Sequence, residues 1–287
     1  MLIDVAQTAV YGVVLGSILS LGAIGVSLTF GILRFANFAH GDLMTLGAYL
    51  ALTGFTVWHW PLPLSVAVAA AGTTIAAISI DRLVFQHLRR RPPVILLISS
   101  FGIATIVRSL VQIIWGPNTQ TYKSGLQLPV VVAGLRIKPD QIVIIVGTFA
   151  IALGLHLFLK YSPIGKAMRA TADNMDLAQV TGIETERIVM WTWALGAMMA
   201  CAAGVFLGLD TRLHPTMGWR LLLSIFAAAI LGGIGKPYGA IAGGMVVGLS
   251  QELSTFIVSP AYKEAVAFVI LVVMLIVRPT GLFGGRS

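Results

Sequence analysis

Long runs of uncharged residues follow one another along the chain. The core of a lipid bilayer is about 30 Å thick and is crossed by roughly 20 residues of α-helix. Runs on that scale cover 5–33, 43–80, 94–115, 141–159 and 188–209, the third of them interrupted only by Arg108. Run 43–80 is long enough for two crossings, and segment 58–63, with two tryptophans and two prolines, divides it at a membrane face. These runs predict six membrane helices.

The last third of the chain has shorter uncharged runs. They cover 221–235, 237–251 and 265–277, and each is somewhat short for a complete crossing. Short segments interrupted by glycine or proline are typical of broken or re-entrant helices. The pattern therefore predicts an all-α polytopic membrane protein with eight to nine membrane segments, some of them broken or re-entrant, in a single domain over 1–287.

The composition excludes a single water-soluble domain. Of the 287 residues, 57% are hydrophobic and 10% are charged, against about a quarter charged in soluble domains. The mean hydropathy is +0.91 and the net charge is +8. In a membrane protein such an excess lies in cytoplasmic loops, so nucleic acid is not expected as a partner. Cys201, the single cysteine, stands in an apolar run and is interpreted as a small packing residue.

Basic residues gather in two connecting segments. Four arginines lie in 81–93, and 160–187 also carries lysines and arginines. Both segments should face the cytoplasm, which leaves 115–140 and 210–220 outside and the C-terminus inside. Counting the membrane crossings back from these segments places the N-terminus outside. If one segment is re-entrant and does not cross, the N-terminus would instead lie inside.

The first candidate site is the polar cluster 34–42 between two long apolar runs. Polar groups at membrane depth are costly and tend to be functional. Asn37 can cap a helix start and Gly41 permits a close approach of a neighbouring helix. We predict that Asn37, Phe38, His40 and Gly41 line a translocation path, with an ordinary loop as the equal alternative. His40 and Asp42 would not share a helix face, so no proton relay is expected between them.

The second candidate is the glycine-rich segment 232–239. Its predicted path residues are Gly232, Gly233, Gly235 and Gly239. Glycines at every fourth position, continuing to Gly243, favour tight packing of helices as the alternative interpretation. Pro237 favours a break in the helix there. The segment lacks the glycine and the Ser or Thr that a nucleotide-binding loop requires, so we expect no ATP site in this chain.

The third candidate is the cytoplasmic segment 162–183. Ser162 followed by Pro163 predicts a helix start, Asp173 is predicted to cap a second short helix, and Gly182 to end it. The amphipathic surface fits a groove on a partner protein, while a plain connecting loop is the alternative. The predicted docking residues are Gly165, Arg169, Asp173, Asp176, Leu177, Ala178 and Gly182.

Motifs for catalysis are missing from the sequence. It has no His-Glu-x-x-His helix, no Gly-x-Ser-x-Gly elbow, no paired intramembrane carboxylates and no cysteine cluster. We therefore expect no catalytic residues and no metal site. Arg108 lies towards the outer end of its run, where extension of the side chain to the interface is a sufficient explanation.

These three segments resemble the permease subunits of the ABC importers for branched-chain (hydrophobic) amino acids, in the wider group that includes ribose permeases. The most specific parts are 31–41, 165–183, 232–235 and 278–284. Asp176-Leu177-Ala178-x-x-x-Gly182 resembles the coupling motif Glu-Ala-Ala-x-x-x-Gly, with Asp in place of Glu and Leu in place of the first Ala. The downstream Ile-x-Leu-Pro of that motif is absent.

The resemblance implies a set of partners in a bacterial inner membrane. A second, similar permease would complete a homo- or heterodimer, two ATPase subunits would bind ATP and Mg below it, and a periplasmic binding protein would deliver the substrate. No cofactor would be bound by this chain, and 160–187 would be its coupling loop. The path would run between 37–41 and 232–239, which would be repeats of one another.

Several other functions stay open at this point. Related permeases carry urea, short amides or other small solutes. An ion-coupled secondary transporter would use similar broken helices but needs an ion site and no ATPase. A role as a membrane scaffold would not explain the two glycine-rich breaks. A role as an intramembrane enzyme would need polar groups that this sequence lacks.

Overall fold

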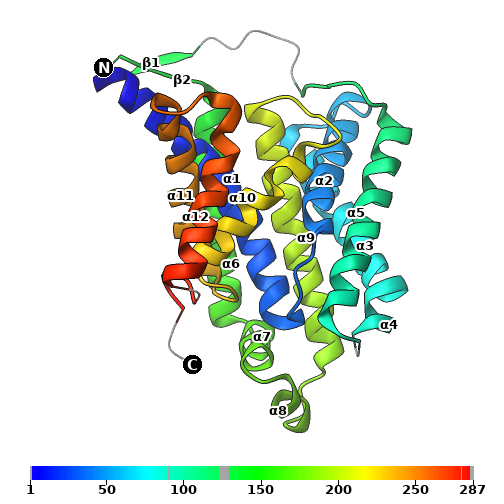
Figure 1. The fold of residues 1–287 in the computed structure, drawn as a ribbon. Coiled ribbons are helices and arrows are strands. Elements are labelled where there is room, and N and C mark those ends of the chain that lie inside the picture. Colours follow the sequence, from blue (N-terminus) through cyan, green and yellow to red (C-terminus); the bar gives the residue numbers. More distant parts are fainter. Residues whose placement is uncertain (1, 90, 123–128, 133, 279, 285–287) are drawn as a thin grey trace.

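The computed structural model describes residues 2–89, 91–122, 129–132, 134–278 and 280–284. Most of them form helices that run roughly parallel in one bundle (Figure 1). The longer helices are α1 (Leu2–Leu33), α2 (Ala39–Thr56), α3 (Leu62–Ile80), α5 (Pro93–Trp115), α6 (Pro139–Tyr161), α9 (Thr185–Asp210), α10 (Met217–Gly232), α11 (Pro237–Leu253) and α12 (Lys263–Val277).

Shorter elements join these helices. They are η1 (Asp81–Phe85), α4 (Gln86–Leu88), α7 (Pro163–Asp173), α8 (Met175–Val180), η2 (Ser254–Phe256) and η3 (Pro260–Tyr262). Strands β1 (Val130–Val132) and β2 (Leu135–Ile137) form an antiparallel hairpin in which Val130 pairs with Ile137. The hairpin lies in the segment predicted to face outside and departs from the all-α prediction.

Within the described residues, six helices are long and apolar enough to cross a membrane. They are Ile3–Leu33, Leu62–Leu88, Pro93–Trp115, Pro139–Tyr161, Thr185–Asp210 and Pro260–Val277. Helix α10 is a shorter apolar helix, and α2 and α11 have 18 and 17 residues. The chain therefore folds as a polytopic helical membrane protein.

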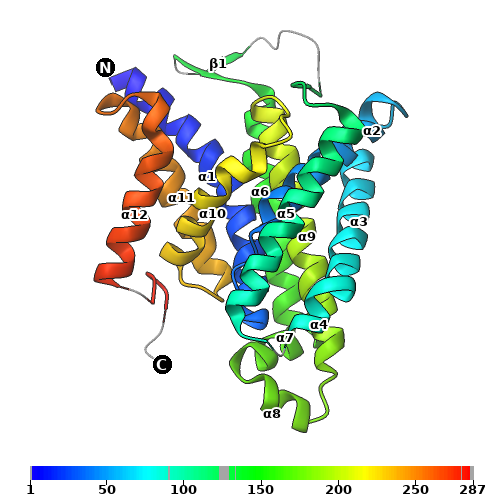
Figure 2. The same cartoon turned by 45° about the vertical axis from the view of Figure 1, so that its right-hand side comes forward.

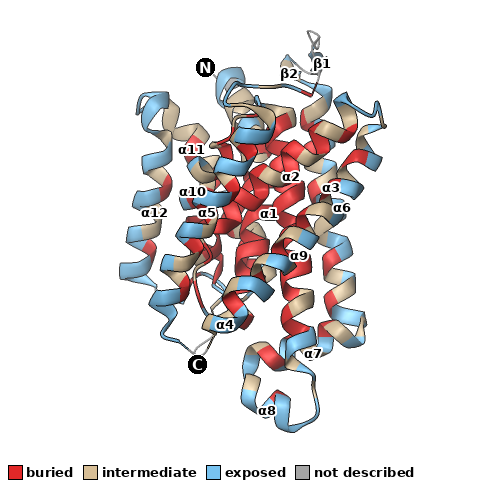
Figure 3. Cartoon of the chain, turned by 90° about the vertical axis from the view of Figure 1, so that its right-hand side faces the viewer, coloured by how far each residue is buried: buried red, intermediate tan, exposed pale blue. Residues whose placement is uncertain are grey.

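Helices α1 and α9 form the centre of the bundle, as the buried residues in Figure 3 show. In their most apolar windows, 83% of α1 and 89% of α9 is buried, against 28% for α5 and 11% for the last apolar span, Pro260–Val277. A helix that is apolar all round is buried against others, whereas the outer helices present one face to lipid. Cys201 lies fully buried in α9, as its interpretation as a packing residue requires.

Helix α11 packs closely on two neighbours through its glycines. A Cβ at Gly244 would overlap the backbone of Ser20, and one at Gly248 would overlap Gly16, both in α1. On another face, a Cβ at Gly243 would overlap Ala228 of α10. The spacing therefore serves tight helix packing here. The predicted break is also present, because α10 ends at Gly232 and α11 begins at Pro237.

The two ends of the bundle carry different connections. Helices α4, α7 and α8 and the C-terminal segment lie at one end, and the N-terminus and the hairpin lie at the other (Figures 1 and 2). At the first end Arg89 pairs with Asp81 at 2.5 Å and with Glu186 at 2.6 Å, which joins α4 to the start of α9. The segments predicted to face the cytoplasm are thus together at one end.

Candidate functional site

An ion pair joins α2 to α5 within the bundle. Arg108 Nε lies 2.9 Å from Asp42 Oδ1, and Arg108 Nη2 lies 2.9 Å from Asp42 Oδ2. The Asp42 side chain is fully buried and that of Arg108 is 21% exposed. The prediction that Arg108 extends to the interface is wrong, because a buried carboxylate 66 residues away holds its guanidinium in a bidentate pair. Charged residues at membrane depth mark functional sites by default.

A series of aromatic rings begins at this ion pair. The Arg108 guanidinium carbon lies 4.6 Å from the ring centre of Trp219, a geometry in which the ring attracts the cation. Trp219 meets Phe101 edge-on at 5.0 Å, and Phe38 lies 5.0 Å from Phe101. Phe38, a predicted path residue, is therefore connected to the ion pair through Phe101 and Trp219.

The first turns of α2 and α10 meet beside Asp42. A Cβ built on Gly41 would lie 2.6 Å from the carbonyl oxygen of Gly218, so no larger residue fits without a shift of backbone. Gly218 N donates to Thr45 Oγ1 at 3.1 Å across the same contact. The unpaired N–H groups of a first helical turn carry partial positive charge, which favours a carboxylate at Asp42.

Asn37 and His40 complete the first predicted site. Asn37 Oδ1 accepts a hydrogen bond from Ala39 N, the first residue of α2, at 3.0 Å, although Phe38 and not Asn37 is the N-cap residue of that helix. His40 is buried and packs against Gly25 of α1.

The second predicted group lies at the other end of α10. Gly232 and Gly239 pack backbone to backbone, Gly233 contacts Gly281, and a Cβ built on Gly235 would lie 3.5 Å from the Cα of Gly31. Gly41 touches the start of α10, and Gly232, the last residue of α10, lies about 20 Å further along that helix. Phe38 is nearer, because its ring centre lies 5.4 Å from that of Phe226, midway along α10. Both predicted path segments therefore contact α10, the first at its start and middle and the second at its end.

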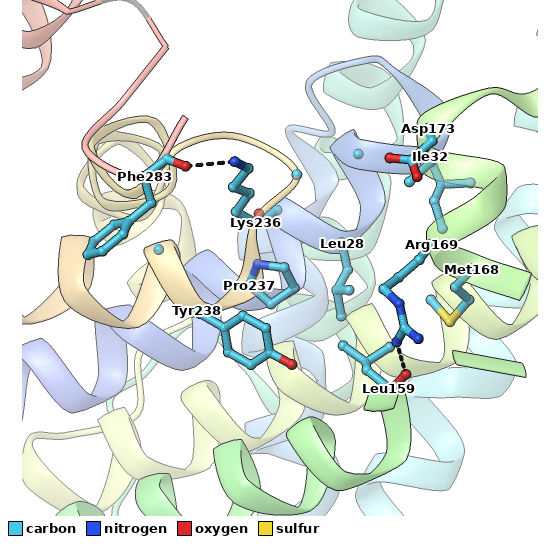
Figure 4. A pocket seen from close by; sticks show the side chains of 15 residues that line it. Leu28, Ile32, Leu159, Met168, Arg169, Asp173, Lys236, Pro237, Tyr238 and Phe283 are labelled. Carbon is cyan, nitrogen blue, oxygen red and sulfur yellow. Dashed lines mark hydrogen bonds between the residues drawn. The ribbon is translucent and has the colours of Figure 1, made fainter. Parts of the chain in front are cut away.

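A cavity of about 400 Å³ lies at the α7 end of the bundle (Figure 4). Leu28 and Ile32 of α1 and Met168 of α7 form much of its apolar lining. The predicted docking residues Arg169 and Asp173 and the predicted path residues Gly235 and Gly239 border the same space. The cavity thus separates α7 from the connection between α10 and α11.

Hydrogen bonds fix both sides of this cavity. The Arg169 guanidinium donates to the carbonyl of Leu159 at the end of α6, and Lys236 Nζ donates to the Phe283 carbonyl at 2.7 Å (Figure 4). A Cβ at Gly165 would overlap the backbone of Leu159, so glycine permits the tight turn from α6 into α7. Helix α7 is therefore fastened to α6.

Helices α7 and α8 are closed by local capping contacts. Ser162 Oγ accepts from Gly165 N at 2.9 Å and Pro163 follows it, which confirms the predicted helix start. The prediction that Asp173 caps the second helix is wrong. Asp173 ends α7, and the neighbouring Asn174 caps α8 by accepting from Leu177 N at 3.0 Å. Gly182 has a φ of +89° just after α8, as expected of a helix-ending glycine.

The surface of α8 is apolar where it faces away from the bundle. Leu177 is 61% exposed and Val180 is 85% exposed, whereas Ala178 is buried. Arg169, Asp173, Asp176 and Gly182 are also exposed, and Gly165 is buried in the turn. Sequence reasoning missed Val180, although its spacing of three from Leu177 places both on one helix face.

Comparison with known proteins identifies the family. Residues 8–275 match the family model described as branched-chain amino acid transport system / permease component. The chain belongs to this family. It is 35% identical to the high-affinity branched-chain amino acid transport system permease protein LivH of Escherichia coli K12, over 95% of this chain and 93% of LivH.

A second relative agrees with this membership, and a solved structure shares the fold. The permease is 32% identical to the high-affinity branched-chain amino acid transport system permease protein BraD of Pseudomonas aeruginosa PAO1, over 97% of this chain and 95% of BraD. A solved structure, PsaBC from Streptococcus pneumoniae in complex with Fab, aligns with a TM-score of 0.50 at 12% identity, covering 97% of this chain and 93% of that one. At that identity the likeness shows the fold alone.

The last feature of the site is its small number of side chains that could bind a metal ion or carry an unpaired buried charge. Among the described residues there is no cluster of three or more His, Cys, Asp or Glu side chains that could hold a metal ion. The fully buried carboxylate of Asp42 and the guanidinium of Arg108 neutralise one another. Arg108 is the sole charge in run 94–115, and this was the signal that could have pointed to a buried partner.

Proposed function

We propose that this permease is the membrane-spanning subunit of an ABC importer that carries branched-chain amino acids across a bacterial inner membrane. The names of LivH and BraD, which match nearly the whole chain, support the substrate class. A second similar permease would complete the path, two ATPase subunits would hydrolyse Mg-bound ATP, and a periplasmic protein would deliver the substrate. The chain itself would bind no cofactor.

The proposal includes nine membrane segments and a coupling loop. Adding α2, α10 and α11 to the six long apolar spans gives nine, which puts the N-terminus and the C-terminus on opposite sides. With 160–187 in the cytoplasm, α7 and α8 would stand below the membrane. The candidate path would pass Asn37, Phe38, His40 and Gly41 and then the segment 232–239.

The observation that carries the proposal is the organised pair α7–α8. Both helices are capped, α7 is fastened to α6, and Leu177 and Val180 are exposed at the tip. An apolar helix edge in water is unfavourable unless a partner covers it. A groove on an ATPase subunit is the partner that the family relationship suggests, and its movement would be passed through α7 to the membrane helices.

Co-purification tests this proposal. Tagged permease is expressed with its ATPase subunits, and the amount of ATPase that it retains is measured. Val180→Glu and Leu177→Glu should each remove most of the bound ATPase, because a charge replaces an apolar contact. Gln179→Glu, on the same short helix beside that edge, is the matched control and should retain it. Equal retention by all three variants would contradict docking at α8.

A further inference from the structure

A second cavity lies at the end of the bundle opposite α7 and α8. Its volume is about 520 Å³, within the roughly 300–1,000 Å³ typical of small-molecule sites. Lining residues come from α1, α6, α9, α10, α11 and α12 and from the connection 211–216. None of the residues predicted for the path or for docking borders it, so it is distinct from the sites already described.

Opposite charges line this cavity together. Lys263 Nζ pairs with Glu252 Oε1 at 2.7 Å, so these two neutralise each other. Among the described residues no hydrogen bond or ion pair engages the guanidinium of Arg220, which borders the cavity from the first turn of α10. Asp210, at the end of α9, also borders the cavity and contributes a carboxylate. The cavity therefore offers a free cation and a carboxylate in one space.

An apolar wall stands between these polar groups. Leu15, Leu207 and Leu221 come from three different helices and line the same space. A simple anion would gain nothing from this wall, and neither would a simple cation. A molecule with both charges and an alkyl side chain would complement all of these groups.

We propose that this cavity binds an aliphatic α-amino acid as a zwitterion on the face where substrate arrives. Arg220 binds the α-carboxylate, since guanidinium groups match carboxylates in two parallel hydrogen bonds. Asp210 accepts a hydrogen bond from the α-ammonium group, and the alkyl side chain packs on Leu207 and its apolar neighbours. The inference rests on the proposed function for its substrate class.

Direct binding to the full-length permease in lipid nanodiscs tests the site. Radiolabelled leucine is the probe, and its competitors are 4-methylpentanoate, which lacks the amine, and isopentylamine, which lacks the carboxylate. Leucine should bind and each competitor should displace it at least tenfold less well than unlabelled leucine. Arg220→Gln and Asp210→Asn should each weaken leucine binding at least tenfold.

The control variant is Arg136→Gln. Arg136 lies at the same end of the bundle, and the hydrogen bonds recorded for it involve its backbone rather than its guanidinium. It should bind leucine like the wild type. Unchanged leucine binding in both cavity variants, or competition by either single-charge analogue as strong as that of unlabelled leucine, would overturn the proposal. So would cavity variants that keep leucine binding but no longer bind the delivery protein, because the cavity would then be a protein contact.

ATPase co-purification from the same preparations separates the two claims. Loss of leucine binding in the cavity variants with ATPase retained supports the site. Failure of the wild type to retain any ATPase would refute the importer assignment, while the leucine measurements would still decide the cavity.

Discussion

Removing Arg108 should destabilise the permease by leaving Asp42 buried without its counter-ion. Asp42 is fully buried, and both of its oxygens lie 2.9 Å from the guanidinium. Breaking a buried pair from one side costs roughly 3–5 kcal/mol. Because Arg108 is 21% exposed, we expect Arg108→Met to cost about 3 kcal/mol, near the lower limit of that range.

The converse variant should cost less. Asp42→Asn keeps the shape of the side chain, and the Arg108 guanidinium left behind can extend towards water along its flexible stem. We expect a loss of about 1.5–2 kcal/mol, in the lower part of the range for a hydrogen bond to a charged group. The double variant should cost less than the sum of the single variants, because the unpaired carboxylate is then absent.

The measurement is the free energy of unfolding of purified permease in mixed detergent and lipid micelles, followed by helical circular dichroism. Arg136→Met is the control and should change the value by less than about 0.5 kcal/mol, as for an exposed side chain. If Arg108→Met matches this control, or if the two single effects are additive, the ion pair does not stabilise the fold as we argue.

Two other substitutions test close contacts in the permease. Gly41→Val places a branched Cβ 2.6 Å from the Gly218 carbonyl oxygen, and this overpacking should cost about 1–3 kcal/mol of folding free energy. The variant should take up less amino acid but still retain the ATPase. The control is Gly102→Ala in α5, where a Cβ would meet nothing within 4 Å, and this variant should keep normal uptake. Gly182→Ala imposes a φ of +89° on a residue with a side chain, at a cost of about 1–2 kcal/mol. The variant should therefore be cleaved faster by protease within 162–183 and should show lower ATP-dependent uptake. An unchanged cleavage rate would show that the left-handed turn is not required.

Local signals in the sequence were sufficient where one or two residues decide the structure. Ser162 with Pro163 begins α7, Gly182 ends α8, and Pro237 opens α11 after a break. Each signal acts through its own backbone, so no distant contact is needed to interpret it. The cap of α8 was misplaced by one position because Asp173 and Asn174 are both good capping residues, and only the fold selects between them.

Non-local contacts decided what the sequence did not reveal. Run 43–80 was defined by the absence of charge, yet α2 begins at Ala39 and includes Asp42, because Arg108 of another helix compensates that charge. The glycine spacing of α11 indicated close packing but not which helices would approach. Both cavities are lined by residues from several helices. The sequence pattern of a single segment does not predict which residues of other helices will lie beside it.

The distribution of tight contacts and open space indicates where the permease can move under the proposed function. Packed contacts such as Gly41 on Gly218 resist gradual deformation, so the helices they join should move together. Helix α7 is fastened to α6 through Arg169, and it faces the α10–α11 connection across a cavity of about 400 Å³. A push on α8 would therefore move α6 with α7, and the cavity would take up the displacement. Filling it with a larger side chain, as in Ala172→Phe at its border, should then reduce uptake while ATPase binding at Val180 persists.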